Sequence, residues 1–262
     1  MSEGRIDTRR DGAVQWIILN NPSRLNAMSR EMQQQFMALL DPIDADPGIR
    51  AVAVTGIGDK AFMSGGDLSQ FDKYRSTSER MVESLESSEI FARRLRALTK
   101  PSVAIIRGWC VGGGISLALN CHLRICSDDA RFFHAASKFG QGFAYDFTRQ
   151  MVRQLGIANA TELLLTCRRY SALEAQRLGI VNQVAPVEGF DAFAASYLAD
   201  LTDKAPLSMV SALRTLAEVT PEPADADLAL IRRLYVECCD SADYAEGGRA
   251  FAEKRTPLFT GR

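Results

Sequence analysis

Histidine is scarce in this sequence, and its charges nearly cancel. Only His122 and His134 occur among the 262 residues, which leaves little material for a histidine-rich metal site or a His-dependent triad. The 31 Lys and Arg residues offset 32 Asp and Glu residues, for a formal net charge of -1. A protein that binds nucleic acid regardless of its sequence would show a basic excess. We therefore expect no nucleic-acid partner, and we expect acid–base chemistry to come mainly from carboxylates.

The sequence also lacks a long apolar segment and a paired cysteine motif. Its first residues include no apolar stretch that could act as a signal peptide. The charge-free run in its most apolar region, from Gly108 to Cys121, is too short for a bilayer, which needs roughly 20 apolar residues. The six cysteines form no C-x-x-C pair, and this favours reduced thiols over a disulfide framework. We expect a cytoplasmic protein with no membrane contact and no metal.

Short apolar runs alternate with helical patterns in the first part of the chain. Branched apolar residues of strand length occupy 14–19, 51–55, 102–107 and 123–127. Apolar residues at helical spacing predict helices from Ser29 to the Pro47-Gly48 stop, over 77–98, after Gly114 and over about 144–155. This alternation predicts an α/β fold.

The character of the sequence changes after about residue 188. Helical patterns fill 190–203, 207–218, 226–238 and 243–254. We therefore predict two regions, an α/β core over 1–190 and a helical C-terminal region over 191–262.

Two glycine loops each follow a predicted strand. One is Ala61–Leu68, which contains Gly65 and Gly66, and the other is Gly108–Gly114, which leads into a predicted helix. Glycine permits positive φ and lets a ligand approach the bare main chain, and a helix N-terminus offers unpaired N–H groups. One N–H from each loop could converge on a developing oxyanion. The alternative is that both loops are tight turns that only pack.

Other nucleotide and hydrolase signatures are absent from the sequence. No G-x-x-x-x-G-K-[ST] or G-x-S-x-G motif occurs, so neither a P-loop nor a hydrolase nucleophile elbow is indicated. Gly56-Ile-Gly58 starts like a dinucleotide fingerprint but lacks the full glycine set.

Taken in order, the motifs of this chain resemble those of the crotonase (enoyl-CoA hydratase/isomerase) superfamily. The segments that carry the resemblance are 20–28, 61–68, 100–108, 112–114, 130–132, 175–182 and 250–259. They follow the family's order over nearly the whole chain. The resemblance implies repeated ββα units wound into a spiral, followed by helices that mediate trimer formation, with trimers often pairing into hexamers.

The resemblance also implies a ligand and the residues that hold it. The ligand is an acyl-CoA thioester, with CoA as part of the substrate and no separate cofactor. Its thioester carbonyl would accept hydrogen bonds from the N–H groups of Gly66 and Gly113. The residues implied along the CoA path are Ala61, Met63, Ser64, Gly65, Tyr235 and Lys254. For Tyr235 and Lys254, an ordinary place on a helix surface is the alternative.

The chain departs from the family where hydratases carry two glutamates. After the triple glycine, Ser116 stands where the first glutamate is expected. In the stretch from Ala130 to Gly140, Ala136 stands at the second. Adding water to a double bond needs one group to activate the water and another to handle the α-proton, and neither Ser116 nor Ala136 can act as a base. The sequence therefore argues against ordinary hydration.

Three other polar side chains remain candidates for the site. Asp146 lies near, but two residues beyond, a position where some family branches carry an aspartate; it could instead complement its helix dipole and pair with Arg149 or Gln150. His134 could reach the acyl group or could be a packed core histidine. Ser116 could position a water or a carbonyl, or could cap its own helix.

These observations lead to one main functional hypothesis and one alternative. The main hypothesis is an enzyme that holds an acyl-CoA enolate with Gly66 and Gly113. Decarboxylation or carbon–carbon cleavage would form that enolate without removing an α-proton, and an isomerase with Asp146 as its sole base stays open. The alternative is a non-catalytic acyl-CoA-binding protein. In either case we expect a homotrimer or hexamer.

Overall fold

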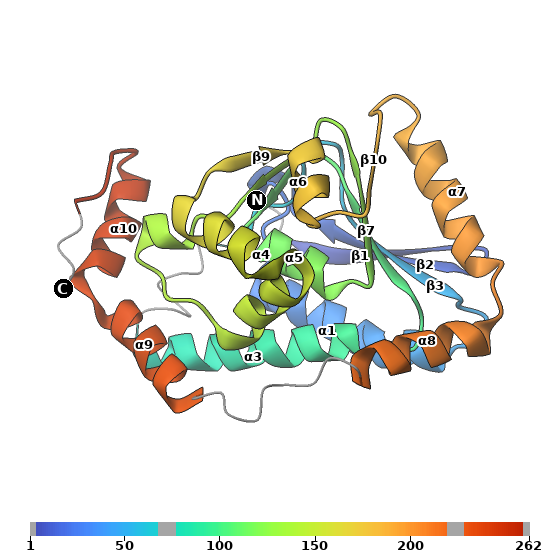
Figure 1. Ribbon diagram of the computed structural model, residues 1–262, viewed down its shortest axis with the longest axis horizontal. Coiled ribbons are helices and arrows are strands. Elements are labelled where there is room, and N and C mark those ends of the chain that lie inside the picture. Colours follow the sequence, from blue (N-terminus) through green and yellow to red (C-terminus); the bar gives the residue numbers. More distant parts are fainter. Residues whose placement is uncertain (1–3, 68–76, 219–227, 259–262) are drawn as a thin grey trace. The chain divides into compact units, whose positions relative to one another are not determined.

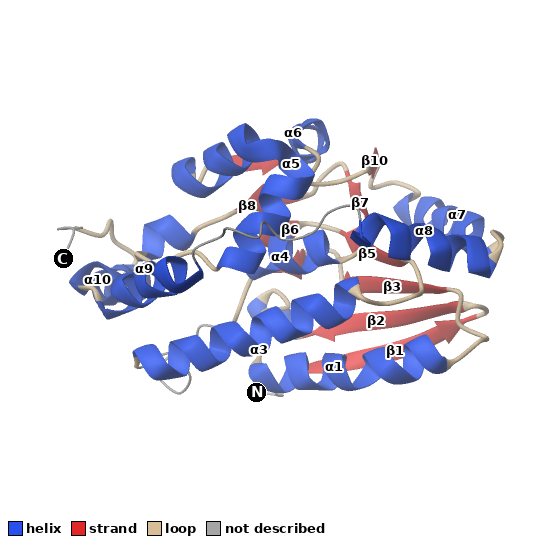
Figure 2. Cartoon of the chain, turned by 60° about the horizontal axis from the view of Figure 1, so that its bottom comes forward, coloured by secondary structure: helices blue, strands red, loops and turns tan. Residues whose placement is uncertain are grey.

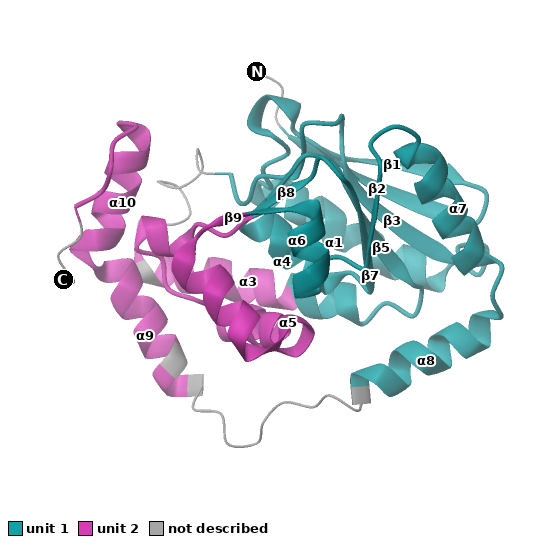
Figure 3. Ribbon diagram, turned by 45° about the horizontal axis from the view of Figure 1, so that its top comes forward, with its two compact units in different colours: residues 1–67, 91–132, 170–223 teal, residues 68–90, 133–169, 224–262 magenta. Residues whose placement is uncertain are grey.

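The computed structural model describes residues 4–67, 77–218 and 228–258 (Figure 1). The chain divides into two compact units, neither of which is continuous in sequence (Figure 3). The first comprises residues 1–67, 91–132 and 170–223, and the second comprises 68–90, 133–169 and 224–262. The predicted division into a core over 1–190 and a helical region over 191–262 stays a prediction.

A six-stranded sheet forms the centre of the first unit. Its strands, in spatial order, are β1 (Arg5–Asp11), β2 (Val14–Asn20), β3 (Ala51–Gly56), β5 (Ser102–Ile106), β7 (Leu123–Ser127) and β10 (Gln183–Ala185). β1 and β2 form an antiparallel hairpin, whereas every other neighbouring pair is parallel. The four strands predicted from apolar runs are confirmed as β2, β3, β5 and β7, and each predicted end lies within one residue of the observed one.

The central strands are apolar along their length because both faces of the sheet are covered. β5 is buried at all five positions and β3 at five of six. On one face, Phe190, Ala194 and Leu198 of α7 (Phe190–Thr202) pack in one core cluster with Ala53 of β3 and Val103 of β5.

Helix α1 (Arg30–Ala45) lies along β1 and β2 in the same unit (Figure 2). Ser29 caps it, because its side chain accepts a hydrogen bond from the Met32 N–H at 3.1 Å. Its apolar stripe is buried at Met32, Phe36, Leu40 and Ile43. The helix predicted from Ser29 to the Pro47-Gly48 stop is thereby confirmed.

A second sheet consists of four very short strands. In spatial order they are β4 (Ala61–Met63), β6 (Trp109–Val111), β8 (Arg131–Phe133) and β9 (Arg169–Ser171). β4 and β6 pair in parallel, with a register shift between Ala61 and Met63. This sheet matters for function because the two glycine loops begin where β4 and β6 end. The remaining helices of the first unit are α4 (Gly113–Asn120), α6 (Ala172–Leu178) and α8 (Pro206–Glu218).

The described part of the second unit is almost entirely helical. Its elements are the 3-10 turn η3 (Ala136–Phe139) and the helices α5 (Tyr145–Thr166), α9 (Leu228–Asp240) and α10 (Ala242–Ala252); α3 (Ser78–Arg96) begins in this unit. The sequence predicted that the helix of α5 would stop at about 155. It continues to Thr166 across Gly156, whose φ of 75° and ψ of 159° break the helical path at that point.

The helices expected in the C-terminal part are confirmed as α7, α8, α9 and α10, with ends that differ by up to two residues. The start predicted for α9, at residue 226, lies outside the described residues. All six cysteines are free, and five of them are buried. Within the residues described, no helix has the length and apolar character needed to cross a membrane.

Candidate functional site

The first glycine loop is held by main-chain pairing with Met28. The Met28 N–H donates to the Gly65 carbonyl at 2.9 Å, and the Asp67 N–H donates to the Met28 carbonyl at 2.9 Å. Met28 and Gly66 thus form a parallel bridge, which leaves the N–H of Gly66 directed away from Met28. Gly65 has a φ of 111°, which only glycine adopts readily.

Asn26 fixes the segment that enters this loop. It is 2 % exposed, and its side-chain amide donates to the Ile57 carbonyl at 3.0 Å and to the Ala61 carbonyl at 2.7 Å. Its side-chain oxygen accepts from the Asn21 N–H at 3.1 Å. Asn26 has a φ of 58°, a left-handed conformation that asparagine tolerates better than most residues. One side chain thereby ties the ends of β3 and β4 together.

The second glycine loop connects β6 to the start of α4. Gly112 is the N-cap with a φ of 52°, and Gly113 is the first helical residue. The first N–H groups of a helix have no intrahelical acceptor. A Cβ on Gly114 would lie 2.3 Å from the Met63 carbonyl oxygen, so only glycine allows this helix to approach β4 so closely.

The two loops meet at Gly65 and Gly113. A Cβ on Gly113 would lie 3.4 Å from the Cα of Gly65, and a Cβ on Gly65 would lie 3.8 Å from the Gly113 nitrogen. Across residues 4–67, 77–218 and 228–258, no hydrogen bond uses the N–H of Gly66 or of Gly113 as donor. Both glycines are also partly exposed. Two unused donors beside the positive end of α4 are suited to stabilise an oxyanion.

Among the residues expected along the CoA path, those of the first unit differ in how exposed their side chains are. Ala61 and Met63 belong to β4 and are 1 % and 5 % exposed. Ser64 is partly exposed, and its hydroxyl donates to the Arg24 carbonyl at 2.9 Å. Asp67 pairs with the Arg24 guanidinium at 2.7 Å and thereby helps to hold the loop. Because these side chains are buried or engaged, Ser64, Gly65 and Gly66 offer mainly their backbone to a ligand.

Ser116 occupies the first turn of α4, partly exposed. Its N–H donates to the Gly112 carbonyl at 3.2 Å, and its carbonyl accepts from the Asn120 side chain at 2.8 Å. The N-cap of the helix is Gly112, with no side-chain cap hydrogen bond, so the alternative that Ser116 caps its own helix is not supported.

His134 belongs to the second unit and is 6 % exposed. Its imidazole stacks on Phe147, with ring centroids 5.1 Å apart, and lies 5.8 Å from the Phe143 ring. Among the residues described, Nδ1 has no hydrogen-bond partner. Burial lowers the pKa of His134 to about 4, because the charged form loses its solvation. The imidazole is therefore neutral near pH 7.

Asp146 lies in the first turn of α5 in the same unit and is 8 % exposed. Its carboxylate accepts from the Arg149 guanidinium at 3.4 Å, one turn along the helix. The pairing anticipated for a helix-terminal acid is thus present. Ala136, at the start of η3, is 9 % exposed and places a methyl group where the sequence suggested a lost glutamate.

Tyr235 and Lys254 also belong to the second unit. Tyr235 on α9 is 7 % exposed and packs with Met81, Cys239 and Tyr244, so in this chain it is a core residue and not an ordinary surface residue. Lys254 follows α10 with a φ of 55° and is exposed.

The sequence singled out neither Asn26 nor Met28 as functional, although both lie inside the 20–28 motif. Their contribution is to shape the first glycine loop through hydrogen bonds to main-chain groups. An asparagine in a Pro-containing stretch was the available signal, but the sequence alone shows neither its burial nor its acceptors.

Comparison with known proteins places the chain in a family. The family model described as enoyl-CoA hydratase/isomerase matches residues 9–262. A putative enoyl-CoA hydratase of Thermus thermophilus is 36 % identical over 253 residues, which cover 95 % of this chain and 98 % of that protein.

Two solved structures show the same fold. An enoyl-CoA hydratase/carnitine racemase from Magnetospirillum magneticum gives a TM-score of 0.81 at 32 % identity, covering 100 % of this chain and 97 % of that one. A methylmalonyl-CoA decarboxylase in complex with 2-nitronate-propionyl-CoA gives 0.87 at 25 % identity, covering 98 % and 99 %. The chain therefore belongs to the enoyl-CoA hydratase/isomerase family and has the crotonase fold that its sequence motifs predicted.

Proposed function

We propose that this protein is an enzyme that binds an acyl-CoA thioester and stabilises its enolate between the N–H groups of Gly66 and Gly113. The observation that carries the proposal is the approach of the two glycine loops, each with a donor that no other group in the described chain uses. Family members act on acyl-CoA substrates, as the names of its relatives state.

We further propose that the enolate forms by loss of a carbon fragment, with decarboxylation as the leading case. Residues 116 and 136 are Ser and Ala, so these positions offer no carboxylate to activate water. In decarboxylation, the bond between Cα and the carboxylate breaks, CO2 leaves, and the electron pair moves into the enolate. The enolate then takes one proton at Cα. No base has to remove an α-proton, so this chemistry suits a site without two glutamates.

The contribution of Gly66 and Gly113 to this reaction is electrostatic. The thioester oxygen gains negative charge as the bond to CO2 breaks, and both donors are already in place when that charge develops. Removing one such donor typically costs about 3 kcal/mol of transition-state stabilisation. The N-terminal end of α4 adds a favourable dipole at the same point.

Two of the buried polar groups of the second unit suggest different roles. The Asp146 carboxylate is engaged by Arg149, whereas His134 Nδ1 has no partner in the described residues. We propose His134, in its neutral form, as the better candidate to contact the acyl group, and Asp146 as the base only if the reaction is an isomerisation.

A panel of thioesters tests the proposed function. We expect CO2 release from a malonyl-type thioester such as malonyl-CoA or methylmalonyl-CoA, and no hydration of crotonyl-CoA. Hydration of crotonyl-CoA at a rate typical of hydratases would contradict the proposal. Binding of all thioesters without turnover of any would instead favour the non-catalytic acyl-CoA-binding protein.

A further inference from the structure

A small cleft opens in the first unit, away from the glycine loops. It lies where the chain enters β3 and β5 and where α7 turns into α8, and its volume is about 60 Å3. That volume holds about four water molecules. The lining residues are Pro47, Ile49, Arg50, Thr99, Lys100, Pro101, Leu201, Lys204, Pro206, Met209 and Val210.

The cleft and the glycine loops lie beside strands of different sheets in the first unit. β3 and β5 run side by side, with Val52 opposite Ser102 at their amino ends. The cleft is at those amino ends, whereas the glycine loops follow β4 and β6 of the four-stranded sheet, and none of their described residues lines the cleft. A ligand in the cleft would therefore be distinct from a thioester held by Gly66 and Gly113.

The charged side chains that line the cleft are all basic. Three of its residues, Arg50, Lys100 and Lys204, are basic, and none is acidic. The Arg50 guanidinium donates to the Lys204 carbonyl, and the Lys100 ammonium donates to the Asp46 carbonyl at 3.1 Å. Both acceptors are neutral main-chain groups. Within the part of the chain that the structure describes, neither Arg50 nor Lys100 forms an ion pair with a carboxylate.

Three carboxylates lie close to the cleft, and two of them are bound mainly to groups that do not carry its positive charge. Asp44 accepts hydrogen bonds from the N–H and hydroxyl of Thr99, at 2.8 and 2.6 Å. The Asp46 carboxylate accepts from Arg10 at 2.6 Å and from the Gly48 N–H at 2.7 Å. Asp203 lies 4.0 Å from the Lys204 ammonium, with its side chain largely in solvent. The positive charge inside the cleft is therefore only partly compensated.

The rest of the lining is apolar. Ile49 is 4 % exposed, and Leu201, Met209, Val210 and three prolines complete the wall. An occupant that matches this surface has an anionic head for the cations and a short hydrocarbon body for the wall. The small volume limits that body to a few carbons.

We propose that this cleft binds a short-chain aliphatic carboxylate. The carboxylate would lie between Arg50 and Lys100, which present donors in addition to their positive charge. Its alkyl chain would contact the apolar side chains of the α7–α8 turn. Inorganic phosphate offers similar charge but no apolar part. Comparing it with a carboxylate therefore shows whether the apolar part of the ligand contributes to binding.

Isothermal titration of the full-length protein tests the proposal with butyrate, n-butanol and inorganic phosphate at matched ionic strength. We expect saturable binding of butyrate, with n-butanol and phosphate each at least tenfold weaker. Lys100→Gln keeps a hydrogen-bond donor and removes the charge, so it should weaken butyrate binding at least fivefold. Arg50→Gln should act in the same direction.

Two controls locate the binding. Arg177→Gln removes an exposed cation on α6 of the same unit and should leave the affinity for butyrate unchanged. Gly113→Pro alters the glycine loop and should also leave it unchanged, which distinguishes the cleft from a thioester site. A thermal unfolding midpoint for each variant shows that the fold is retained.

Several outcomes would overturn the assignment. They are equal binding of n-butanol and butyrate, phosphate binding as tight as that of butyrate, an affinity that Lys100→Gln leaves unchanged, or binding lost in Gly113→Pro. Binding of butyrate that does not saturate would also refute a defined site.

Discussion

Gly65 and Gly113 come from loops 48 residues apart in sequence, yet a side chain on Gly113 would begin 3.4 Å from the Cα of Gly65. Each loop starts at the end of a three-residue strand of one sheet, so the pairing of β4 with β6 sets this approach. The two glycine clusters are visible in the sequence. The pairing of β4 with β6 brings them together, so that one place in the structure has two main-chain N–H donors.

The first prediction removes one donor of this pair. Gly113→Pro eliminates the N–H at the first position of α4, a place where helices accept proline. We expect kcat for the acyl-CoA reaction to fall about 100- to 1000-fold, the usual cost of losing one oxyanion donor. Steady-state kinetics on the best thioester substrate measures this effect.

Gly113→Ala is the matched control, because it keeps the N–H. Its Cβ would lie 3.3 Å from Met63 Cε, which a small shift of the methionine can relieve, and 3.4 Å from Gly65 Cα, an ordinary van der Waals distance. Its kcat should stay within about tenfold of the wild-type value. An equal loss in both variants would show that crowding, and not the missing donor, limits the reaction.

The second prediction concerns Asn26, which joins the ends of β3 and β4. Replacing it with Ala leaves the buried carbonyl of Ala61 and the partly buried carbonyl of Ile57 without their donor. We expect the free energy of unfolding to fall by about 2 kcal/mol, within the range for a buried polar group that loses its partner. Urea denaturation followed by circular dichroism gives this value.

Asn26→Gly separates the side chain from the backbone conformation. Glycine adopts the φ of 58° at this position without strain but supplies no amide. If the hydrogen bonds matter, Asn26→Gly is destabilised nearly as much as Asn26→Ala. Full stability of the glycine variant would assign the effect to the left-handed backbone alone.

The sequence predicted the buried strands well because burial on both faces makes them continuously apolar. Its runs at 51–55 and 102–107 correspond to β3 and β5. It did not predict β1, whose sequence RIDTRRD is charged and largely exposed. That strand exists because it pairs with β2 along seven residues, and no local pattern records such a partner.

For a similar reason, some parts of the candidate site could be predicted from the sequence and others could not. Glycine clusters are visible in a sequence, so the two loops could be named, whereas β4 and β6 are three residues long and too short for any periodicity. The partners of polar side chains depend on tertiary packing. Neither the contact of Asn26 with Ala61 nor the phenyl rings around His134 could be assigned before the fold was known.

The third prediction uses the buried imidazole of His134, whose pKa is lowered to about 4 from an ordinary value of 6.5. Between these values the unfolded chain takes up a proton that the folded chain does not, so stability falls as pH falls from about 6.5 to 4. From pH 7.5 to 5.0 this group should cost about 2 kcal/mol. Urea denaturation at the two pH values, compared with His134→Phe, isolates its share.

His134→Phe places a ring that cannot be protonated between Phe143 and Phe147. The free energy of unfolding of this variant should change less over the same pH interval. The difference from the wild-type protein is the contribution of His134. His122, the other histidine with a pKa lowered to about 4 by burial, is common to both proteins and cancels in the comparison. Identical pH dependence of both proteins would mean that His134 is protonated as readily in the folded chain as in the unfolded one.

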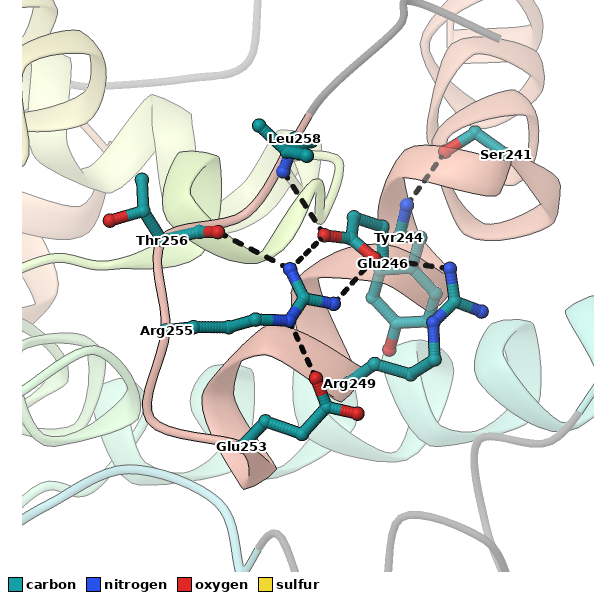
Figure 4. A network of polar contacts seen from close by, with 8 residues as sticks. All are labelled: Ser241, Tyr244, Glu246, Arg249, Glu253, Arg255, Thr256 and Leu258. Atoms are coloured by element: carbon teal, nitrogen blue, oxygen red, sulfur yellow. Dashed lines mark hydrogen bonds and ion pairs between the residues drawn. The ribbon is translucent and has the colours of Figure 1, made fainter.

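The last prediction concerns Glu246, which holds the chain after α10 against the helix (Figure 4). Its carboxylate accepts from Arg255 at 2.5 and 3.0 Å, from Arg249 at 3.1 Å and from the Leu258 N–H at 3.0 Å. These donors, Arg255 first, lower the pKa of Glu246 to about 2. The stability that this network contributes is therefore complete above about pH 4.5 and is lost as pH falls through the folded-state pKa of about 2.

Glu246→Gln should release this segment at neutral pH, because the neutral amide binds two guanidinium groups more weakly. Trypsin should then cleave after Lys254 and Arg255 several-fold faster than in the wild-type protein, as mass spectrometry of a time course would show. Glu237→Gln, which removes an exposed carboxylate 3.7 Å from Arg233 on α9, is the matched control and should leave the rate unchanged. If both variants are cleaved at the wild-type rate, the hydrogen bonds to Glu246 do not restrain the segment. If both are cleaved faster, the effect comes from the loss of any negative charge in this region and not from the Glu246 network.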